Sequence, residues 1–255
     1  MEKVIDVKGL YAKYDDKEIL SDVSFSAYKG EITVIIGGSG SGKTTIFRHL
    51  LGLNPIEKGY VSVLNKEISD LSEKEMKDMY HQMGVFYQNA ALLSSLTVAE
   101  NVAMPLAHQS NLPKQLIREI VMMKLGLVNL KEAHDLYPSQ LSGGMLKRVA
   151  LARAIAMDPP LLFCDEPGAG LDPVSLQSLD RLILNLKDQL GISVILVTHE
   201  ITSIIRIADR VVFLNHGRVL FQGTLKEALA SEIKEIKEFF SILQTRHDLP
   251  AKEKN

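Results

Sequence analysis

The sequence predicts an α/β domain that has a β-rich segment at its N-terminus and an inserted helical subdomain. Three observations support this fold class. Short apolar runs at 32–36, 161–164 and 193–197 are typical of buried strands, and helical patterns follow the first two. Residues 1–36 contain runs that alternate between apolar and polar side chains, which indicates half-buried strands. Residues 89–140 have helical spacing and no strand-like runs.

The composition is that of a globular protein and excludes several classes. The 255 residues are 46% hydrophobic and 24% charged, which suits one large domain or a domain with a subdomain. A net charge of −2 gives no electrostatic reason to expect nucleic acid as a partner. The single cysteine, Cys164, fits a reducing compartment. Without a signal peptide or an apolar run near the ~20 residues that span a bilayer, we expect a soluble chain.

A glycine-rich turn joins the apolar run 32–36 to the helical pattern 46–51. Glycines allow the main chain to wrap closely and to point successive N–H groups inward, and the helix adds its free N–H groups and positive dipole end. This strand, turn and helix predict a phosphate-binding P-loop rather than a merely flexible turn. Its residues are Gly37, Gly38, Ser39, Gly40, Ser41, Gly42, Lys43, Thr44 and Thr45. Lys43 would reach the β- and γ-phosphates, and the Thr44 hydroxyl would bind Mg²⁺.

A second helix start with the properties of an anion site follows the helical insert. Ser142, Gly143 and Gly144 enter a helix that continues to about Ala156. Two separate phosphate-binding helix starts in one chain are hard to explain with one small ligand bound to one copy.

Polar side chains also follow three predicted strands. Asp165 and Glu166 end one strand, Gln88 ends another and His199 follows a third. Because the carboxyl ends of strands in an open α/β sheet meet at one edge, these groups are expected near the P-loop. Asp165 would then bind the Mg²⁺ shell and Glu166 would polarise a water molecule, although two acids at a strand end are otherwise a solvated turn. We expect the two acids to point to opposite faces because they are adjacent on a strand.

Other segments complete the organisation. We assign the α/β core to 1–88 and 141–223, the helical subdomain to about 89–140, C-terminal helices to 224–245 and a charged tail to 246–255. In the helical subdomain, Pro105 and Pro113 are expected to break helices, and the pair Met122 and Met123 to fill the core. An apolar stripe from Ile233 to Leu243 predicts a helix that docks on the body of the domain or on a second copy.

These motifs, in this order, resemble the ATP-binding cassette (ABC) family over about residues 4–230. Gly37 to Thr45 resembles the Walker A loop, Leu141 to Met145 the signature motif and Leu161 to Glu166 the Walker B motif. Further positions match single residues of the family: Gln88 the Q-loop glutamine, Asp172 the D-loop, His199 the switch histidine and Tyr14 the aromatic A-loop position. By its spacing alone, Tyr14 could equally be a packing residue next to a turn.

The resemblance implies a P-loop NTPase core with a mixed sheet, an N-terminal antiparallel β subdomain and the inserted helices. It implies ATP and Mg²⁺ as cofactors and a head-to-tail homodimer with two ATP molecules at the interface. Tyr14 would stack on adenine, and Ser142, Gly143, Gly144 and Asp172 would complete the partner's site. Glu166, His199, Gln88 and Lys43 would carry catalysis, and Thr44, Gln88 and Asp165 would organise Mg²⁺.

Met145 stands where most cassettes have glutamine, and its surroundings are similar to the ATPase subunits of Mla/Mce-type lipid transporters. That likeness implies a peripheral protein on the cytoplasmic face of a bacterial inner membrane, powering lipid traffic between inner and outer membrane. An integral membrane permease would dock near Gln88 and the helical subdomain, and a Mce-type substrate-binding protein would join the complex.

Three rival interpretations remain. An importer ATPase for an amino acid or a metal shares every motif except the surroundings of Met145. A non-transport cassette that acts on the ribosome or DNA usually carries two cassettes or a long coiled coil, and this chain has neither. A P-loop kinase or small GTPase would lack the signature motif and His199.

Overall fold

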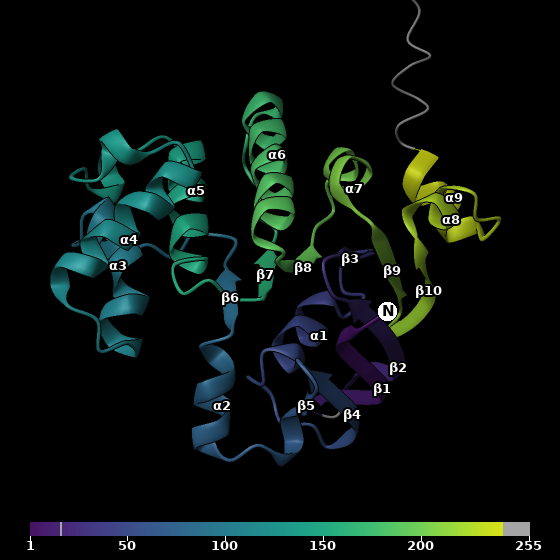
Figure 1. Cartoon of the computed structure of the whole chain (residues 1–255). Helices are drawn as coiled ribbons and strands as arrows, with labels where there is room; N and C mark the ends of the chain where they lie inside the picture. The colour runs from purple at the N-terminus through teal and green to yellow at the C-terminus, as the bar shows by residue number, and fades with distance from the viewer. Residues whose placement is uncertain (16, 242–255) are drawn as a thin grey trace, which may run out of the picture.

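The computed structural model describes residues 1–15 and 17–241, which form two sheets with helices around them (Figure 1). One sheet has four strands in the order β2-β1-β4-β5, and the other has six in the order β10-β9-β3-β8-β7-β6. The strands are β1 (Lys3–Tyr14), β2 (Lys17–Tyr28), β3 (Ile32–Gly37), β4 (Lys58–Val63), β5 (Lys66–Glu67), β6 (Met83–Phe86), β7 (Leu161–Asp165), β8 (Ser193–Val197), β9 (Arg210–Asn215) and β10 (Arg218–Thr224).

The six-stranded sheet is mixed. Strands β6, β7, β8, β3 and β9 run parallel to one another, and β10 pairs with β9 in the antiparallel sense. The four-stranded sheet is antiparallel throughout, with β1 between β2 and β4. The predicted fold class, a mixed α/β core with an N-terminal antiparallel β part and inserted helices, is therefore confirmed.

Different elements pack against the two faces of the six-stranded sheet. Ile35 faces the core shared with α1 (Lys43–Leu50) and the antiparallel sheet. Its neighbours Val34 and Ile36 face the core shared with α5 (Gly143–Ala154), α6 (Pro173–Leu190) and α7 (Ile201–Ile207). This alternation is expected for a strand buried on both faces, and it explains why β3 is entirely apolar apart from Thr33 and Gly37.

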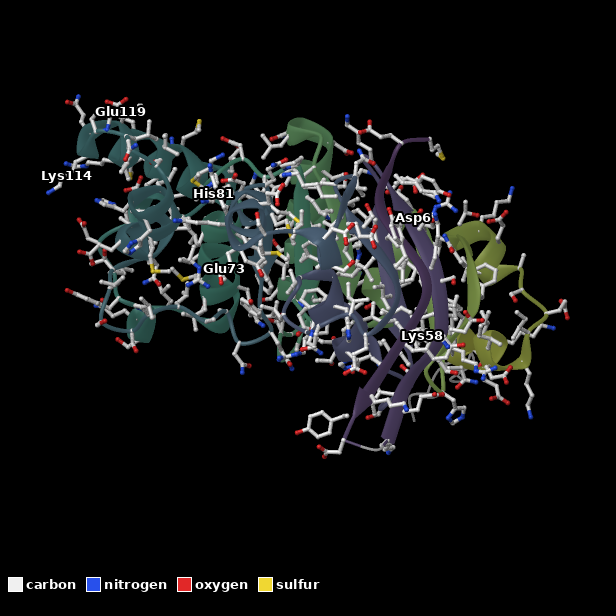
Figure 2. The ribbon with its side chains drawn as sticks, turned by 90° about the horizontal axis from the view of Figure 1, so that it is seen from below. Asp6, Lys58, Glu73, His81, Lys114 and Glu119 are labelled. Carbon is white, nitrogen blue, oxygen red and sulfur yellow. The ribbon has the colours of Figure 1, made fainter. Side chains whose placement is uncertain are left out.

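The inserted helices pack together at one end of the molecule. They are α3 (Val98–Gln109) and α4 (Lys114–Leu127), which lie against α5. Figure 1 shows these three helices on the far side of β6 and β7 from α1, and Figure 2 shows Lys114 and Glu119 of α4 at the opposite end from Asp6 and Lys58 of the antiparallel sheet.

Two sequence expectations about the insert are wrong. Pro105 lies inside α3 and does not break it, because Val98, Val102 and Leu106 of the same helix are buried in the core and packing outweighs the local preference. Met123 is 51% exposed, so only Met122 of that methionine pair packs against the core. Pro113, as expected, lies at a boundary and caps the start of α4.

The remaining helices are short. They comprise α2 (Glu73–Tyr80), α8 (Leu225–Leu229), α9 (Lys234–Ser241) and the 3₁₀ turns Ile68–Asp70, Lys131–Ala133 and Pro138–Gln140. The α9 stripe docks on the body of the domain, where Phe239 meets Phe213 edge to face at 5.5 Å and Ile236 is buried. Leu243 and the tail 246–255 lie outside the described residues. None of the helices in the described ranges is long and apolar enough to span a membrane.

Candidate nucleotide-binding site

The glycine-rich turn lies between β3 and α1 and needs its glycines for steric reasons. Gly37 has φ 148°, and a Cβ there would come within 2.2 Å of the Leu214 carbonyl oxygen of β9. Gly42 has φ 105°, and a Cβ there would come within 2.5 Å of Leu20. The turn is therefore held tightly between two strands, and α1 begins immediately after it with its free N–H groups.

The Lys43 ammonium lies inside this turn. It donates hydrogen bonds to the carbonyl oxygens of Gly37 and Gly38, both at 2.9 Å. Burial lowers the pKa of Lys43, and the nearby Glu166 carboxylate partly offsets this effect. The buried Ser41 hydroxyl has no hydrogen-bond partner, and Thr44 is exposed at the first turn of α1. The turn thus offers a cation, unpaired hydroxyl groups and main-chain amides, which is the chemistry that binds phosphate.

The strand ends meet as the parallel topology requires. Ile35 of β3 pairs with Val197 of β8, and Val197 pairs with Asp165 of β7. Ile35, Val197 and Asp165 therefore lie side by side across the sheet, and Gly37 ends β3 two residues beyond Ile35. Burial, and secondarily the charge of Glu166, raises the pKa of the Asp165 carboxyl above its ordinary value. A carboxylate held in this way is one that a cation would stabilise.

Glu166 leaves the strand, contrary to the expected alternation. Its φ is 44°, in the left-handed region that residues with a Cβ rarely adopt, and its N–H donates to the Val197 carbonyl at 2.8 Å. The main chain therefore turns at Glu166, and the rule that strand neighbours face opposite sides does not apply to it. One carboxylate oxygen of Glu166 pairs with Nδ1 of His199 at 2.9 Å, and the other is buried without a partner.

His199 comes from the end of β8, just before α7. Its side chain is 64% exposed; Nδ1 meets Glu166 at 2.9 Å, and Nε2 lies 3.9 Å from the Glu200 carboxylate. The following helix is anchored to α6 through the buried Asp180, which accepts hydrogen bonds from Ser203 at 2.9 Å and from Arg206. The histidine is thus placed by a braced element in contact with the Glu166 carboxylate.

Tyr14 ends β1 with its ring 76% exposed. It lines a hollow together with Asp15, Lys17, Ile19 and Thr45, the last of which belongs to the P-loop helix. Figure 2 shows the β1–β2 hairpin extending beyond the rest of the molecule. An open aromatic ring on the rim of the P-loop suits a stacking partner for a base, and its exposure speaks against the packing alternative.

Gln88 follows β6 by two residues and is exposed, because the strand itself ends at Phe86. Its main-chain carbonyl accepts a hydrogen bond from Lys147 of α5. The sequence did not indicate a role for Lys147 or for Arg153. The Arg153 guanidinium group donates to the carbonyls of Ala90 and Ala91 in the same loop. The only available signal was the presence of three cations, Lys147, Arg148 and Arg153, in a helix that is otherwise apolar or glycine.

The second anion site lies apart from the first. Ser142 caps α5 by accepting from the Met145 N–H at 3.3 Å, and its residue is exposed. Gly144 lies beside Ser175, and Gly143 lies beside Leu171. Leu171 and Ser175 flank Asp172, which caps α6. Figure 1 shows α5 and α1 well separated, with β6 and β7 between them. Within the described ranges, no side-chain hydrogen bond links Ser142 to the P-loop. One copy of the chain therefore does not bring the two anion sites together.

Comparisons with known proteins give the same family as the motifs. The family model described as ABC transporter matches residues 20–169. The intermembrane phospholipid transport system ATP-binding protein MlaF of Haemophilus influenzae is 38% identical over 238 residues, which are 93% of this chain and 90% of the relative. The methionine import ATP-binding protein MetN of the same species is 42% identical over 221 residues, 87% of this chain and 64% of MetN.

Among solved structures, the dimeric ATP-binding cassette MJ0796 in a post-hydrolysis state with ADP and Pi superposes with a TM-score of 0.78 at 29% identity. The match covers 87% of this chain and 98% of that one. The family match spans more than half of the chain, and the relatives are named as ATP-binding proteins. The chain belongs to the ABC transporter family and is an ATP-binding ATPase of that family.

Proposed function

We propose that two copies of this chain form the ATPase engine of a bacterial transporter, with each ATP bound between the P-loop of one copy and Ser142, Gly143 and Gly144 of the other. The observation that carries this proposal is the separation of the two anion sites within one copy. A head-to-tail pair brings each P-loop against a partner's α5. The solved structure of the MJ0796 cassette, which is dimeric and bound to ADP and Pi, supports a pair of copies.

The roles within the site follow from the geometry. Lys43 and the P-loop amides bind the phosphates, and Tyr14 stacks on adenine. Thr44, Gln88 and Asp165 supply oxygen ligands of the kind that Mg²⁺ prefers. Phosphate oxygens of the nucleotide would complete the coordination.

Glu166 is the candidate general base. Its unpaired buried oxygen can accept a proton from an attacking water molecule, while the other oxygen is held by His199. The Nε2 edge of His199, which is largely exposed and lies 3.9 Å from Glu200, would turn to the γ-phosphate. Positioning and charge neutralisation, rather than covalent chemistry, would supply most of the rate.

A groove next to Gln88 suits a membrane partner. Its volume is about 530 Å³. It lies between the α/β core and the inserted helices, and its lining is mainly apolar. The lining includes Leu51, Leu53, Tyr80, Tyr87, Met104 and Met157, of which Leu53 and Tyr87 are nearly half exposed. We assign this groove to the permease, which would place the chain on the cytoplasmic face of the inner membrane and would let Gln88 report nucleotide occupancy to the membrane part. Residues of both proposed subdomains, 1–88 with 141–223 and 89–140, line this groove.

For the cargo, we propose lipid moved between two membranes, in line with the name of MlaF and its 90% coverage. The close likeness to MetN makes import of a small solute the second candidate.

Purification of the chain with its native membrane partners, followed by identification of co-purified small molecules, separates the two cargo candidates. Phospholipid and a Mce-type protein in the complex would support lipid transport. A receptor with a bound amino acid would contradict it and would favour the importer.

A further inference from the structure

The loop from Tyr87 to Thr97 contains Gln88 and joins β6 to α3. Its main chain is hydrogen-bonded to side chains of α3 and α5. The Gln88 carbonyl accepts from the Lys147 ammonium. The Ala90 and Ala91 carbonyls each accept from the Arg153 guanidinium at 2.7 Å. Both cations belong to α5, the helix that begins at Ser142. The loop is therefore attached to the same helix that carries the signature motif.

The conformation of the loop needs such support. Ala90 and Ala91 have φ values of 59° and 49°, in the left-handed region that disfavours residues with a Cβ. Arg153 binds the carbonyls of both residues with one planar, two-pronged group, which fixes their relative orientation. Consecutive left-handed alanines persist only where the surroundings hold them. Arg153 holds their carbonyls, while their N–H groups donate to the carbonyls of Tyr87 and Asn89 within the loop.

The far end of the loop is fixed to α3. Asn101 is fully buried and donates to the carbonyls of Leu93, Leu96 and Thr97, while its side-chain oxygen accepts from the Leu93 N–H at 2.8 Å. On the core side, the β6 ladder to β7 ends at Phe86. Gln88 is thus the first residue past the core whose main chain is bonded to the helical side.

The two cations have no acidic partner among residues 1–15 and 17–241. Lys147 is 8% exposed, and apart from the Gln88 carbonyl it faces the Phe86 ring at 5.6 Å. Burial lowers the pKa of both side chains. A buried charge is expensive unless its hydrogen bonds are satisfied, and here the loop carbonyls provide that satisfaction. Removing either cation therefore removes hydrogen bonds to the loop and breaks no ion pair with an acidic side chain of the described residues.

We infer that Lys147 and Arg153 are positioning residues that fasten Gln88 to the signature helix, so that Gln88 and Ser142 shift as one unit. This inference rests on the proposed function, in which Gln88 reads one nucleotide and Ser142 of the same copy meets the partner's nucleotide. The two cations make the response at one ATP dependent on the position of the other.

The first test compares two Lys147 variants of similar length. Lys147→Met removes the donor, and Lys147→Gln keeps an N–H donor for the Gln88 carbonyl. We expect Lys147→Met to lower kcat for ATP hydrolysis roughly tenfold to a hundredfold through misplacement of Gln88, with little change in KM because the P-loop is intact. Lys147→Gln should restore most of kcat. Lys187→Met is the matched control, since it removes a half-buried lysine that binds Asp209 away from the site.

A double-mutant cycle with Gln88→Ala decides whether Lys147 acts through Gln88. We expect Lys147→Met to cause no further loss of kcat in the Gln88→Ala background. Additive losses, a rise in KM without a fall in kcat, or an equal loss in Lys187→Met would overturn the inference. If Lys147→Met does not fold, Arg153→Lys takes its place, because it keeps the charge but loses the two-pronged contact, and the same outcomes decide.

A second readout is independent of hydrolysis. The chain has no tryptophan, so Tyr87→Trp introduces a single reporter beside Gln88. In that background, Lys147→Met should lower the fluorescence anisotropy and raise acrylamide quenching, and Lys147→Gln should reverse both. Unchanged anisotropy and quenching would contradict the inference that Lys147 holds the loop in place. A Gln88→Ala variant with wild-type hydrolysis would contradict only the proposed role of Gln88. The anisotropy measurement would then decide separately whether Lys147 holds the loop in place.

Discussion

At the scale of single residues, Asp165 and Glu166 bring two carboxylates with unfavourable electrostatics into the site. The Asp165 pKa is raised by burial and by the neighbouring Glu166 carboxylate, and Glu166 itself keeps one buried oxygen unpaired. Both features would be relieved when a cation and nucleotide enter. The site is therefore expected to be less stable when empty than a neutral version of itself.

Asp165→Asn tests this directly. A carboxyl whose folded pKa is raised stabilises the fold fully below its unfolded pKa and loses that contribution as pH rises through the folded pKa. At neutral pH the ionised Asp165 therefore costs stability, and Asp165→Asn should raise the melting temperature of the nucleotide-free protein by about 2–4 °C. Thermal unfolding followed by circular dichroism measures this shift.

The same variant has an internal control. In acidic buffer, below the ordinary carboxyl range, the difference between Asp165→Asn and wild type should vanish, because both side chains are then neutral. Added ATP and Mg²⁺ should raise the melting temperature less in Asp165→Asn than in wild type. A variant that is less stable at neutral pH, or stabilised as much by ATP and Mg²⁺, would contradict the assignment.

At the scale of elements, the helices and strands that carry the site were predictable because local rules set them. The apolar runs predicted β3, β7 and β8. In the structure, Ser72, Thr97 and Thr224 each form a capping box with a glutamate three residues later, and these boxes begin α2, α3 and α8. The left-handed turn at Glu166 and the helical Pro105 were not predictable from local pattern, because tertiary contacts impose them.

The loop after Gln88 is the clearest case of a feature that only the structure reveals. Lys147 and Arg153 lie about 60 residues further along the chain than the carbonyls they bind, and no spacing rule connects such positions. Lys124 behaves similarly. It is buried to 1% exposure, and its ammonium pairs with Asp158, which lies 34 residues further along the chain.

Asn101→Ala tests how far this loop depends on α3. The change leaves the Leu93 N–H and the carbonyls of Leu93 and Leu96 without their buried partner, so we expect a loss of about 1–3 kcal/mol of unfolding free energy. Urea unfolding provides the measurement. The exposed Asn111→Ala serves as the matched control and should be nearly neutral. Equal stability of the two variants would show that Asn101 does not brace the loop.

At the scale of the whole molecule, the order of motifs predicted the family, and the separation of the two anion sites points to a pair of copies. Gly37 to Thr45 is half of a site, and Ser142 to Gly144 of a second copy is the other half. The parallel strand ends, readable from sequence, bring Asp165 into line with β3 across the sheet, and the structure adds the contact of Glu166 with His199.

Ser142→Arg follows from this arrangement. The exposed cap of α5 would present a bulky cation to the partner's nucleotide, so hydrolysis should fall at least a hundredfold while one copy still binds ATP through its own P-loop. Steady-state hydrolysis and binding of a fluorescent ATP analogue measure the two effects separately. Loss of nucleotide binding together with hydrolysis would show that Ser142 serves the site of its own copy.

The most direct test of the shared site is the sedimentation velocity of Glu166→Gln with and without ATP. Glu166→Gln should bind ATP without hydrolysing it, and the bound nucleotide should convert the 28.3 kDa chain into a dimer. Adding Ser142→Arg to the same chain should keep it monomeric with ATP still bound. A Glu166→Gln protein that stays monomeric when saturated with ATP, or that hydrolyses ATP at the wild-type rate, would contradict the account.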